Sequence, residues 1–391
     1  MPVSTGIEPP YAHALCPEPH ERPDLWPWTA WRRDDGLLEI QGQALTDITS
    51  GHSLPLTLLD NQDLEGRASV WVSALAEEFW DGYGLAGASA FCSVDHLPSA
   101  EAARIVVRSG MGVSVASMQD INTAVQAGAA PSVLDVDANV LSSDILHAAL
   151  MAHTDGDVPR VVIGTITEAA QVNSLAAQYD LIVPVFIRVS ISGSPRVSEN
   201  SSDLPRKQQS TVSWRSPQSD ALITHIVASD NLEFQGFSGE VDSLGENESA
   251  WIETGRQLMH IRSDCVHRYG SCAAELRCIQ RGREASWQEL EPLSALPLSR
   301  KLADMVREES KTTGFSVPHL SLHIGRSVVF PSTITVCQAT ARDDIFRGIR
   351  VTLANRFPNK HWASEDLIVI PSGSIAGLCQ TPLLTIPHSA N

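Results

Sequence analysis

Lysine is scarce in this 391-residue chain. It supplies only four of the 28 basic residues, and the first of them is Lys207. The others are Lys301, Lys311 and Lys360. A lysine amine is what an enzyme needs to form a Schiff base with a carbonyl cofactor or substrate. The first half of the chain therefore contains no residue that could carry this chemistry.

A long apolar run is also missing. No segment approaches the roughly 20 apolar residues that a helix needs to cross a bilayer. The longest run, Leu181 to Ile191, contains Pro184 and Arg188 and is typical of a buried strand. The first residues have neither the basic start nor the apolar stretch of a signal peptide. We therefore expect a cytoplasmic protein with no membrane partner.

Cysteine pairs and excess positive charge are missing as well. The seven cysteines are odd in number and scattered, which favours free thiols in a reducing compartment. Cys265, His267, Cys272 and Cys278 lack the paired spacing of a zinc site, so we expect no metal. The 28 basic residues face 46 acidic ones, for a net charge of −18. Nucleic acid needs positive patches and is not an expected partner.

What the chain does contain is a repeated alternation of apolar runs and segments with helical spacing. The runs that we predict to be strands are 88–94, 112–116, 133–136, 161–164, 181–191, 232–238, 273–279 and 319–324. Ser117 is a good cap for the helix after the second run, and Gly128 is a good end for it. Such alternation predicts a parallel sheet with helices outside it, an α/β fold.

Short motifs along this pattern occur in a recognisable order. They are Leu54-Pro55-Leu56 before Asp60, Ala102-Ala103-Arg104, Val113-Ser114-Val115-Ala116-Ser117, Ala127-Gly128 and Gly325-Arg326. Between about residues 24 and 340 the chain resembles bacterial diaminopimelate decarboxylases. These are fold-type III pyridoxal-phosphate (PLP) enzymes, a class that includes alanine racemase and ornithine decarboxylase. The resemblance implies a (β/α)8 TIM-like barrel, a smaller β-sheet domain built from both chain termini, and a homodimer.

The resemblance and the length together predict the domain organisation. A barrel of this kind takes about 250 residues. We predict a proline-rich irregular arm at 1–30, strands of the β domain at 31–60, the barrel at 61–326 and a shortened C-terminal β domain at 327–391. Within the barrel, the serine-rich segment 192–218 is predicted to be a mobile loop. In the C-terminal domain, strand runs are predicted at Val328–Cys337, Ile345–Leu353 and Leu367–Ile370.

The positions that hold the cofactor in that family differ here. The family's first barrel strand ends in Tyr-Ala-x-Lys, and alignment back from Gly110 places Asp95 where the Schiff-base lysine would be. The histidine that stacks on the cofactor ring is replaced by Ser238. The glutamate that pairs with the ring nitrogen is replaced by His323. A late Gly-Ala-Tyr motif reads Gly373-Ser374-Ile375.

The phosphate-binding loop is also altered. The family's triple glycine resembles Arg281-Gly282-Arg283 here, whose side chains would crowd an anion. Gly282, Arg283, Gly325 and Arg326 are still candidates for a residual site for a small anion at the barrel mouth. Pairing of these arginines with local acids explains them equally well. Asp95 and Glu240 would face the same mouth, either as an acid/base pair or as solvated carboxylates.

Together these departures predict a non-catalytic relative of the decarboxylases with no cofactor. It would act as a binding or regulatory subunit, as a homodimer or paired with an active decarboxylase. The alternative is a divergent PLP-dependent amino-acid decarboxylase, of the type that converts diaminopimelate to lysine, with a relocated lysine. A barrel that acts on an anionic substrate without the cofactor, and a relic with no selected function, are also consistent with the sequence.

Overall fold

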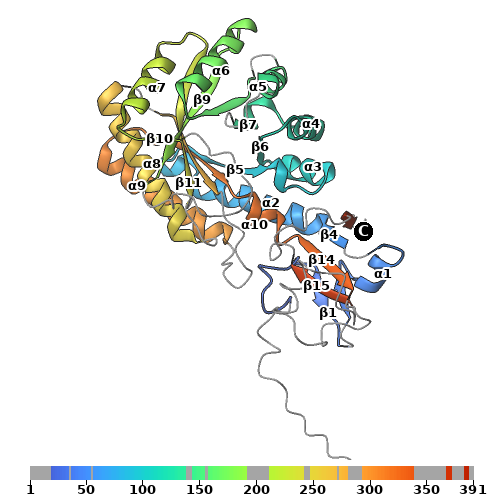
Figure 1. Ribbon diagram of the computed structural model, residues 1–391. Coiled ribbons are helices and arrows are strands. Elements are labelled where there is room, and N and C mark those ends of the chain that lie inside the picture. The colour runs from blue at the N-terminus through green and yellow to red at the C-terminus, as the bar shows by residue number, and fades with distance from the viewer. Residues whose placement is uncertain are drawn as a thin grey trace, which may run out of the picture. The chain divides into compact units, whose positions relative to one another are not determined.

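The computed structural model describes a chain of two compact units. The described residues are 19–34, 37–53, 56–137, 143–154, 157–191, 211–241, 247–270, 273–280, 293–338, 367–371 and 383–386. One unit comprises Met1–Leu64, Ser286–Gln288 and Val329–Asn391, and the other comprises Glu65–Ala285 and Glu289–Val328. Figure 1 shows the larger unit as parallel strands with helices around them.

The larger unit is a closed barrel of eight parallel strands. They are β5 (Ala88–Ser93), β6 (Gly112–Val115), β7 (Leu134–Asp137), β8 (Arg160–Ile163), β9 (Val183–Ser190), β11 (Leu232–Val241), β12 (Glu275–Gln280) and β13 (His319–His323). Each strand pairs in parallel with its neighbours, and the pairings β8–β9 and β13–β5 close the ring. The predicted fold class is confirmed.

Helices alternate with the strands along the chain and lie around the barrel. They are α2 (Asn61–Glu78), α3 (Ala100–Arg108), α4 (Met118–Ala127), α5 (Ser143–Leu150), α6 (Ile166–Gln178), α7 (Pro217–Val227), α8 (Glu248–Tyr269) and α9 (Ala295–Thr313). Ser117 accepts a 3.1 Å hydrogen bond from the Asp120 amide, and Gly128 ends α4 in the left-handed region at φ +85°. Ser99, Thr165 and Ser216 cap α3, α6 and α7 in the same way. These caps explain why helices begin so soon after strands.

The smaller unit contains two sheets. β1 (Ala30–Arg32), β2 (Leu38–Ile40) and β3 (Gln43–Ala44) form one, and α1 (Leu45–Thr49) follows it. The second has the order β15-β14-β4-β16, made of β4 (Leu56–Asp60), β14 (Thr333–Gln338), β15 (Leu367–Pro371) and β16 (Leu383–Ile386). β4 pairs antiparallel with β14 and parallel with β16. Both ends of the chain therefore contribute strands to one sheet, as the predicted fold class required.

Two local predictions need correction. Residues 211–218 were predicted to belong to a loop, but Val212–Ser213 form strand β10 beside β9, and α7 begins at Pro217. Trp214 and Arg215 between them bind Asp264 of α8, which fixes a segment that composition alone marked as irregular. Residue Val328 was predicted to begin a strand, but it lies in the short helix α10 (Gly325–Val329). The predicted strand Ile345–Leu353 and residues 192–210 lie outside the described residues.

Among the described residues, no helix is both long and apolar enough to cross a bilayer.

Candidate functional site

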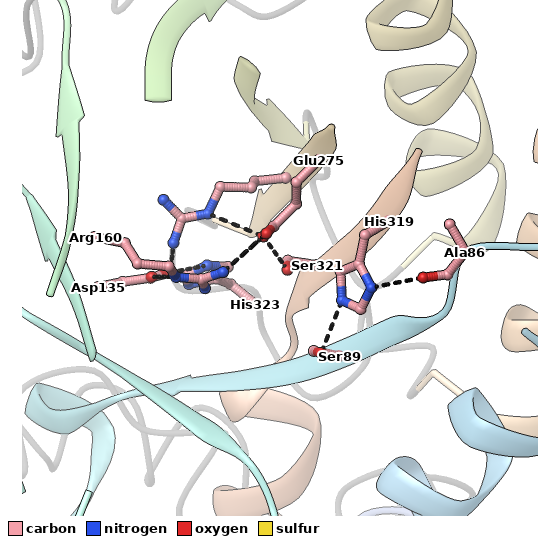
Figure 2. A network of polar contacts seen from close by, with 9 residues as sticks. Ala86, Ser89, Asp135, Arg160, Glu275, His319, Ser321 and His323 are labelled. Atoms are coloured by element: carbon pink, nitrogen blue, oxygen red, sulfur yellow. Dashed lines mark hydrogen bonds and ion pairs between the residues drawn. The ribbon is translucent and has the colours of Figure 1, made fainter. Parts of the chain in front are cut away.

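The interior of the barrel contains a network of charged side chains. Asp135 on β7 accepts a 2.7 Å hydrogen bond from Arg160 Nε on β8, and it also contacts the Arg277 guanidinium on β12. The Nε2 atom of His323, at the end of β13, lies 3.1 Å from Asp135 Oδ2. The side chain of Asp135 is 2% exposed, and that of Arg277 is wholly buried. One carboxylate thus contacts partners on three other strands. Figure 2 shows Asp135 together with Arg160 and His323.

A second carboxylate completes the network. Glu275 on β12 accepts two hydrogen bonds of 2.9 and 3.0 Å from Arg160 Nη1, and it also accepts one from the Ser321 hydroxyl. Arg277 Nε lies 3.9 Å from Glu275 Oε1. Two carboxylates and two guanidinium groups therefore balance each other in charge. Such pairing is what permits charges to remain in a closed interior.

Aromatic rings enclose the two arginines. Arg277 lies 4.2 Å from the ring centre of Phe186 on β9, and Arg160 lies 4.6 Å from the ring centre of Phe91 on β5. His323 stacks on Phe91 with ring centres 5.0 Å apart and planes 15° apart. Guanidinium groups are attracted to aromatic faces, most strongly where water is excluded. Both arginines are therefore held by aromatic rings as well as by carboxylates.

Burial controls the ionisation of the network. It lowers the pKa of Arg277 to about 9, a value that still leaves the guanidinium protonated at neutral pH. Burial also lowers the pKa of Arg160, while the charge and hydrogen bonds of Glu275 act in the opposite direction.

Three of the charged residues lie at the N-terminal ends of their strands, whereas His323 is the last residue of β13. Arg160 and Glu275 are the first residues of β8 and β12, and Asp135 is the second residue of β7. The side chains of Asp135 and Arg277 are buried, those of Arg160 and Glu275 are 13% and 12% exposed, and each charge is paired within the network. We therefore assign these charged groups a structural role.

At the C-terminal mouth, Asp95 and His96 lie in the turn of 3₁₀ helix Val94–His96 that follows β5. The Asp95 side chain is 63% exposed, and its Oδ1 atom is 3.9 Å from His96 Nε2. Burial lowers the pKa of His96, Asp95 raises it, and the positive charge of Arg326 lowers it. Asp95, His96 and Arg326 therefore lie within electrostatic reach of one another. Asp95 is not part of the interior network.

Gly325 has a packing reason to be glycine. A Cβ atom on Gly325 would lie 2.5 Å from Cys92 Sγ and 3.0 Å from Cys92 Cα. The amide of Ile324 also donates a 3.0 Å hydrogen bond to the Phe91 carbonyl. The chain must approach β5 closely here. Gly325 is therefore explained without an anion. Cys92 itself is fully buried, which raises its pKa and leaves an unreactive thiol.

The other predicted site positions are spread over the barrel. Ser238 on β11 is buried, and its register neighbours are Arg188 on β9 and Arg277 on β12. Glu240 lies two residues further along β11, half-buried near the mouth. His323 joins the interior network. Gly282, Arg283 and Ile375 lie outside the described residues, as do Lys207 and Lys360.

The described lysines lie away from the barrel interior. Both are on α9, where Lys301 pairs with Glu248 of α8 and is 54% exposed, and Lys311 is exposed. Among the described residues, no group of three or more His, Cys, Asp or Glu side chains is placed to hold a metal ion.

Sequence reasoning missed the interior network. Asp135, Glu275 and Arg277 lie in short apolar runs that were interpreted only as strands, and Arg160 immediately precedes the run 161–164. The available signal was a charged residue inside a strand expected to be buried on both faces, since such a charge needs a partner.

Comparison with known proteins agrees with this fold. No family model matches the chain. It is 22% identical over 330 residues to the diaminopimelate decarboxylase of Mycobacterium tuberculosis, covering 83% of this chain and 71% of that protein. It is 20% identical over 330 residues to that of Bacillus subtilis, covering 83% of this chain and 72% of that protein.

Solved structures show the same architecture. Diaminopimelate decarboxylase from M. jannaschii has a TM-score of 0.69 at 14% identity, over 82% of this chain and 71% of that one. A lysine/ornithine decarboxylase from Vibrio vulnificus, complexed with cadaverine, has a TM-score of 0.59 at 10% identity, over 87% and 96%. At such identity these structures establish the fold alone.

Proposed function

Because this chain is related to diaminopimelate decarboxylases over 83% of its length, we propose that it keeps their barrel as a binding scaffold and has lost their Schiff-base chemistry. The observation that carries this proposal is the placement of the described lysines. Both lie on α9, outside the ring of strands, and Lys301 is engaged by Glu248. A Schiff base formed at the barrel mouth would need an amine there.

The described residues do not fit pyridoxal phosphate, the cofactor that the resemblance implies. Asp95 offers a carboxylate in place of an amine. Ser238 has no ring to stack on the cofactor, and it lies between strands that carry Arg188 and Arg277. His323 already contacts Asp135 and stacks on Phe91. We therefore derive no chemical step through this cofactor.

We further propose that the protein acts as a subunit, either in a homodimer or paired with an active decarboxylase. The related sequences are named diaminopimelate decarboxylases, and subunits that share a fold can pair through equivalent surfaces. The mouth around Gly325 and Arg326, together with Gly282 and Arg283, would then hold a small anion such as a phosphate or a carboxylate. The exposed part of Arg326, close to His96, supports this part of the proposal.

The loss of Schiff-base chemistry is tested with the cofactor itself. The full-length protein is incubated with pyridoxal phosphate, its absorbance is recorded, and borohydride reduction is followed by peptide mapping. We expect no stoichiometric adduct on any one lysine. The proposal would be overturned if one lysine were trapped and if its replacement by alanine abolished decarboxylation of diaminopimelate. That result would establish the divergent enzyme instead.

The partner is tested separately. The protein is co-expressed with the diaminopimelate decarboxylase of the same genome, and the complexes are weighed by native mass spectrometry. We expect a mixed species containing one copy of each chain. If only the two separate homo-oligomers form at micromolar concentrations, the paired-subunit model is wrong, while the homodimer remains.

A further inference from the structure

A serine and a histidine form a pair at the end of the barrel opposite the mouth. Ser89 is the second residue of β5, and His319 is the first residue of β13, the neighbouring strand that closes the barrel. The Ser89 hydroxyl lies 2.9 Å from His319 Nε2. The other ring nitrogen, Nδ1, lies 3.1 Å from the carbonyl oxygen of Ala86. Figure 2 shows this pair beside the ionic network.

The carbonyl of Ala86 determines which ring nitrogen carries the proton. A carbonyl oxygen can only accept a hydrogen bond, so Nδ1 must donate to it. In the neutral imidazole Nε2 is then the acceptor, and the Ser89 hydroxyl donates to it. A hydroxyl hydrogen-bonded to an unprotonated imidazole, which a third group orients, is the arrangement of an activated serine nucleophile.

The pair is partly exposed and held in place. Ser89 and His319 are both half-buried, and Ala86 is exposed. Gly87, at φ +89°, lets the chain turn against the imidazole, since a Cβ there would lie 3.2 Å from Nδ1. Neither residue is part of the Asp135–Glu275 network or of the family positions considered above.

An apolar surface precedes the pair along the chain. The rings of Trp80 and Tyr83 pack edge to face with centres 5.4 Å apart, and each side chain is 57% exposed. Tyr83 is three residues before Ala86, so the chain holds them within about 11 Å of each other. Exposed aromatic rings of this kind favour an aryl or alkyl group over a charged one.

We propose that Ser89 and His319 form a nucleophilic dyad that takes acyl groups from small, uncharged, activated esters. Ser89 Oγ attacks the ester carbonyl carbon, and its proton passes to His319 Nε2. The bond from the carbonyl carbon to the alcohol oxygen breaks, and the alcohol leaves with the proton from His319. Water then releases the acid from the acyl-serine by the same route, so the sum is ester plus water giving acid plus alcohol.

The orienting group sets the expected rate. A carbonyl holds the imidazole in the correct tautomer but carries no full negative charge to stabilise the imidazolium that forms, as a carboxylate would. Turnover is therefore expected to be slow. Formation of the covalent serine adduct is the better measurement.

The test uses a serine-directed fluorophosphonate. Its reaction forms an Oγ–P bond and releases fluoride, with the hydroxyl proton taken up by His319. The full-length protein is labelled, and the modified residue is identified by peptide mapping. We expect one adduct, on Ser89, formed at least tenfold faster than in protein unfolded with urea. Labelling at another residue, or no faster than in the unfolded chain, overturns the proposal.

Substitutions distinguish a serine activated by His319 from an exposed serine that reacts without activation. Ser89→Ala should abolish the adduct, and His319→Gln should slow it at least tenfold, because glutamine can accept the hydrogen bond but cannot take the proton. The matched control is Ser93→Ala, a half-buried serine at the other end of β5, which should change nothing. Unchanged labelling of folded His319→Gln would contradict the role of the imidazole.

Discussion

The Arg277 guanidinium contacts the Asp135 carboxylate inside the barrel, and neither side chain has more than 2% of its surface exposed. This contact joins β12 to β7 across the interior. Because a buried charge without a partner is costly, the stability of the barrel depends on this pairing.

The first prediction concerns that carboxylate. Asp135→Ala leaves Arg160 and Arg277 without one of their partners and should lower the free energy of unfolding by about 3–5 kcal/mol. Denaturant titration measures the change. The control is Asp304→Ala, which removes the exposed pair with Arg307 and should cost less than about 1 kcal/mol. Equal losses of unfolding free energy in the two variants would show that the interior pair stabilises the protein no more than the exposed pair does.

The second prediction concerns the close approach of Gly325 to β5. Gly325→Ala places a Cβ atom 2.5 Å from Cys92 Sγ and should destabilise the protein by about 1–3 kcal/mol. Combining it with Cys92→Ala removes that sulfur and should recover part of the loss. Thermal unfolding of the two single variants and the double variant gives the coupling. Additive effects would show that the sulfur is not what excludes a side chain.

The third prediction concerns His96 at the mouth. Its pKa should lie below the ordinary value of about 6.5, chiefly because of burial. Arg326→Gln should raise that pKa, and Asp95→Asn should lower it further, because the two charges act in opposite directions. NMR titration measures the His96 pKa in the natural chain and in these two variants. The His96 signal is identified by its absence in His96→Gln. Shifts of the reverse sign would mean that these groups do not face one another.

The fourth prediction concerns Asp264, which accepts hydrogen bonds from Trp214 Nε1 at 2.7 Å and from Arg215 Nη2 at 2.8 Å. The Arg215 hydrogen bond is the main cause that lowers its pKa. Since the folded pKa lies below the unfolded one, this stability is complete above the unfolded pKa and is lost as pH falls through the folded pKa.

The stability contributed by the Asp264 carboxylate is therefore lost at about pH 4 and below. Asp264→Asn should be less stable than the natural chain at pH 7, and the difference should shrink as the pH falls through that window. Unfolding measured at several pH values tests this. A difference that stays constant with pH would show that the carboxylate charge is not involved.

Local sequence signals predicted much of the fold. Ser117 and Gly128 marked the start and end of one helix because capping is decided by a few neighbouring residues. Val328 was assigned to a strand from its apolar neighbours, but it lies in a helix. Short apolar runs suit either structure, and packing chooses between them.

The site was harder to predict than the fold. The alignment placed Asp95 at the family's lysine position, but could not show that its side chain is largely exposed beside His96. The pairing of Ser89 with His319 joins residues 230 positions apart. Nothing in their local sequence marks either residue, because only closure of the barrel brings β13 next to β5.

The sequence by itself determined the alternation of strands and helices, and it determined that no lysine precedes Lys207, because both are properties of the order of residues. Only the tertiary structure decided which charges meet. Asp135, Arg160, Glu275, Arg277 and His323 come from four strands, and the residues beside each of them do not identify its partners on the other strands. They form one balanced network because a closed ring of strands points their side chains into the same enclosed interior.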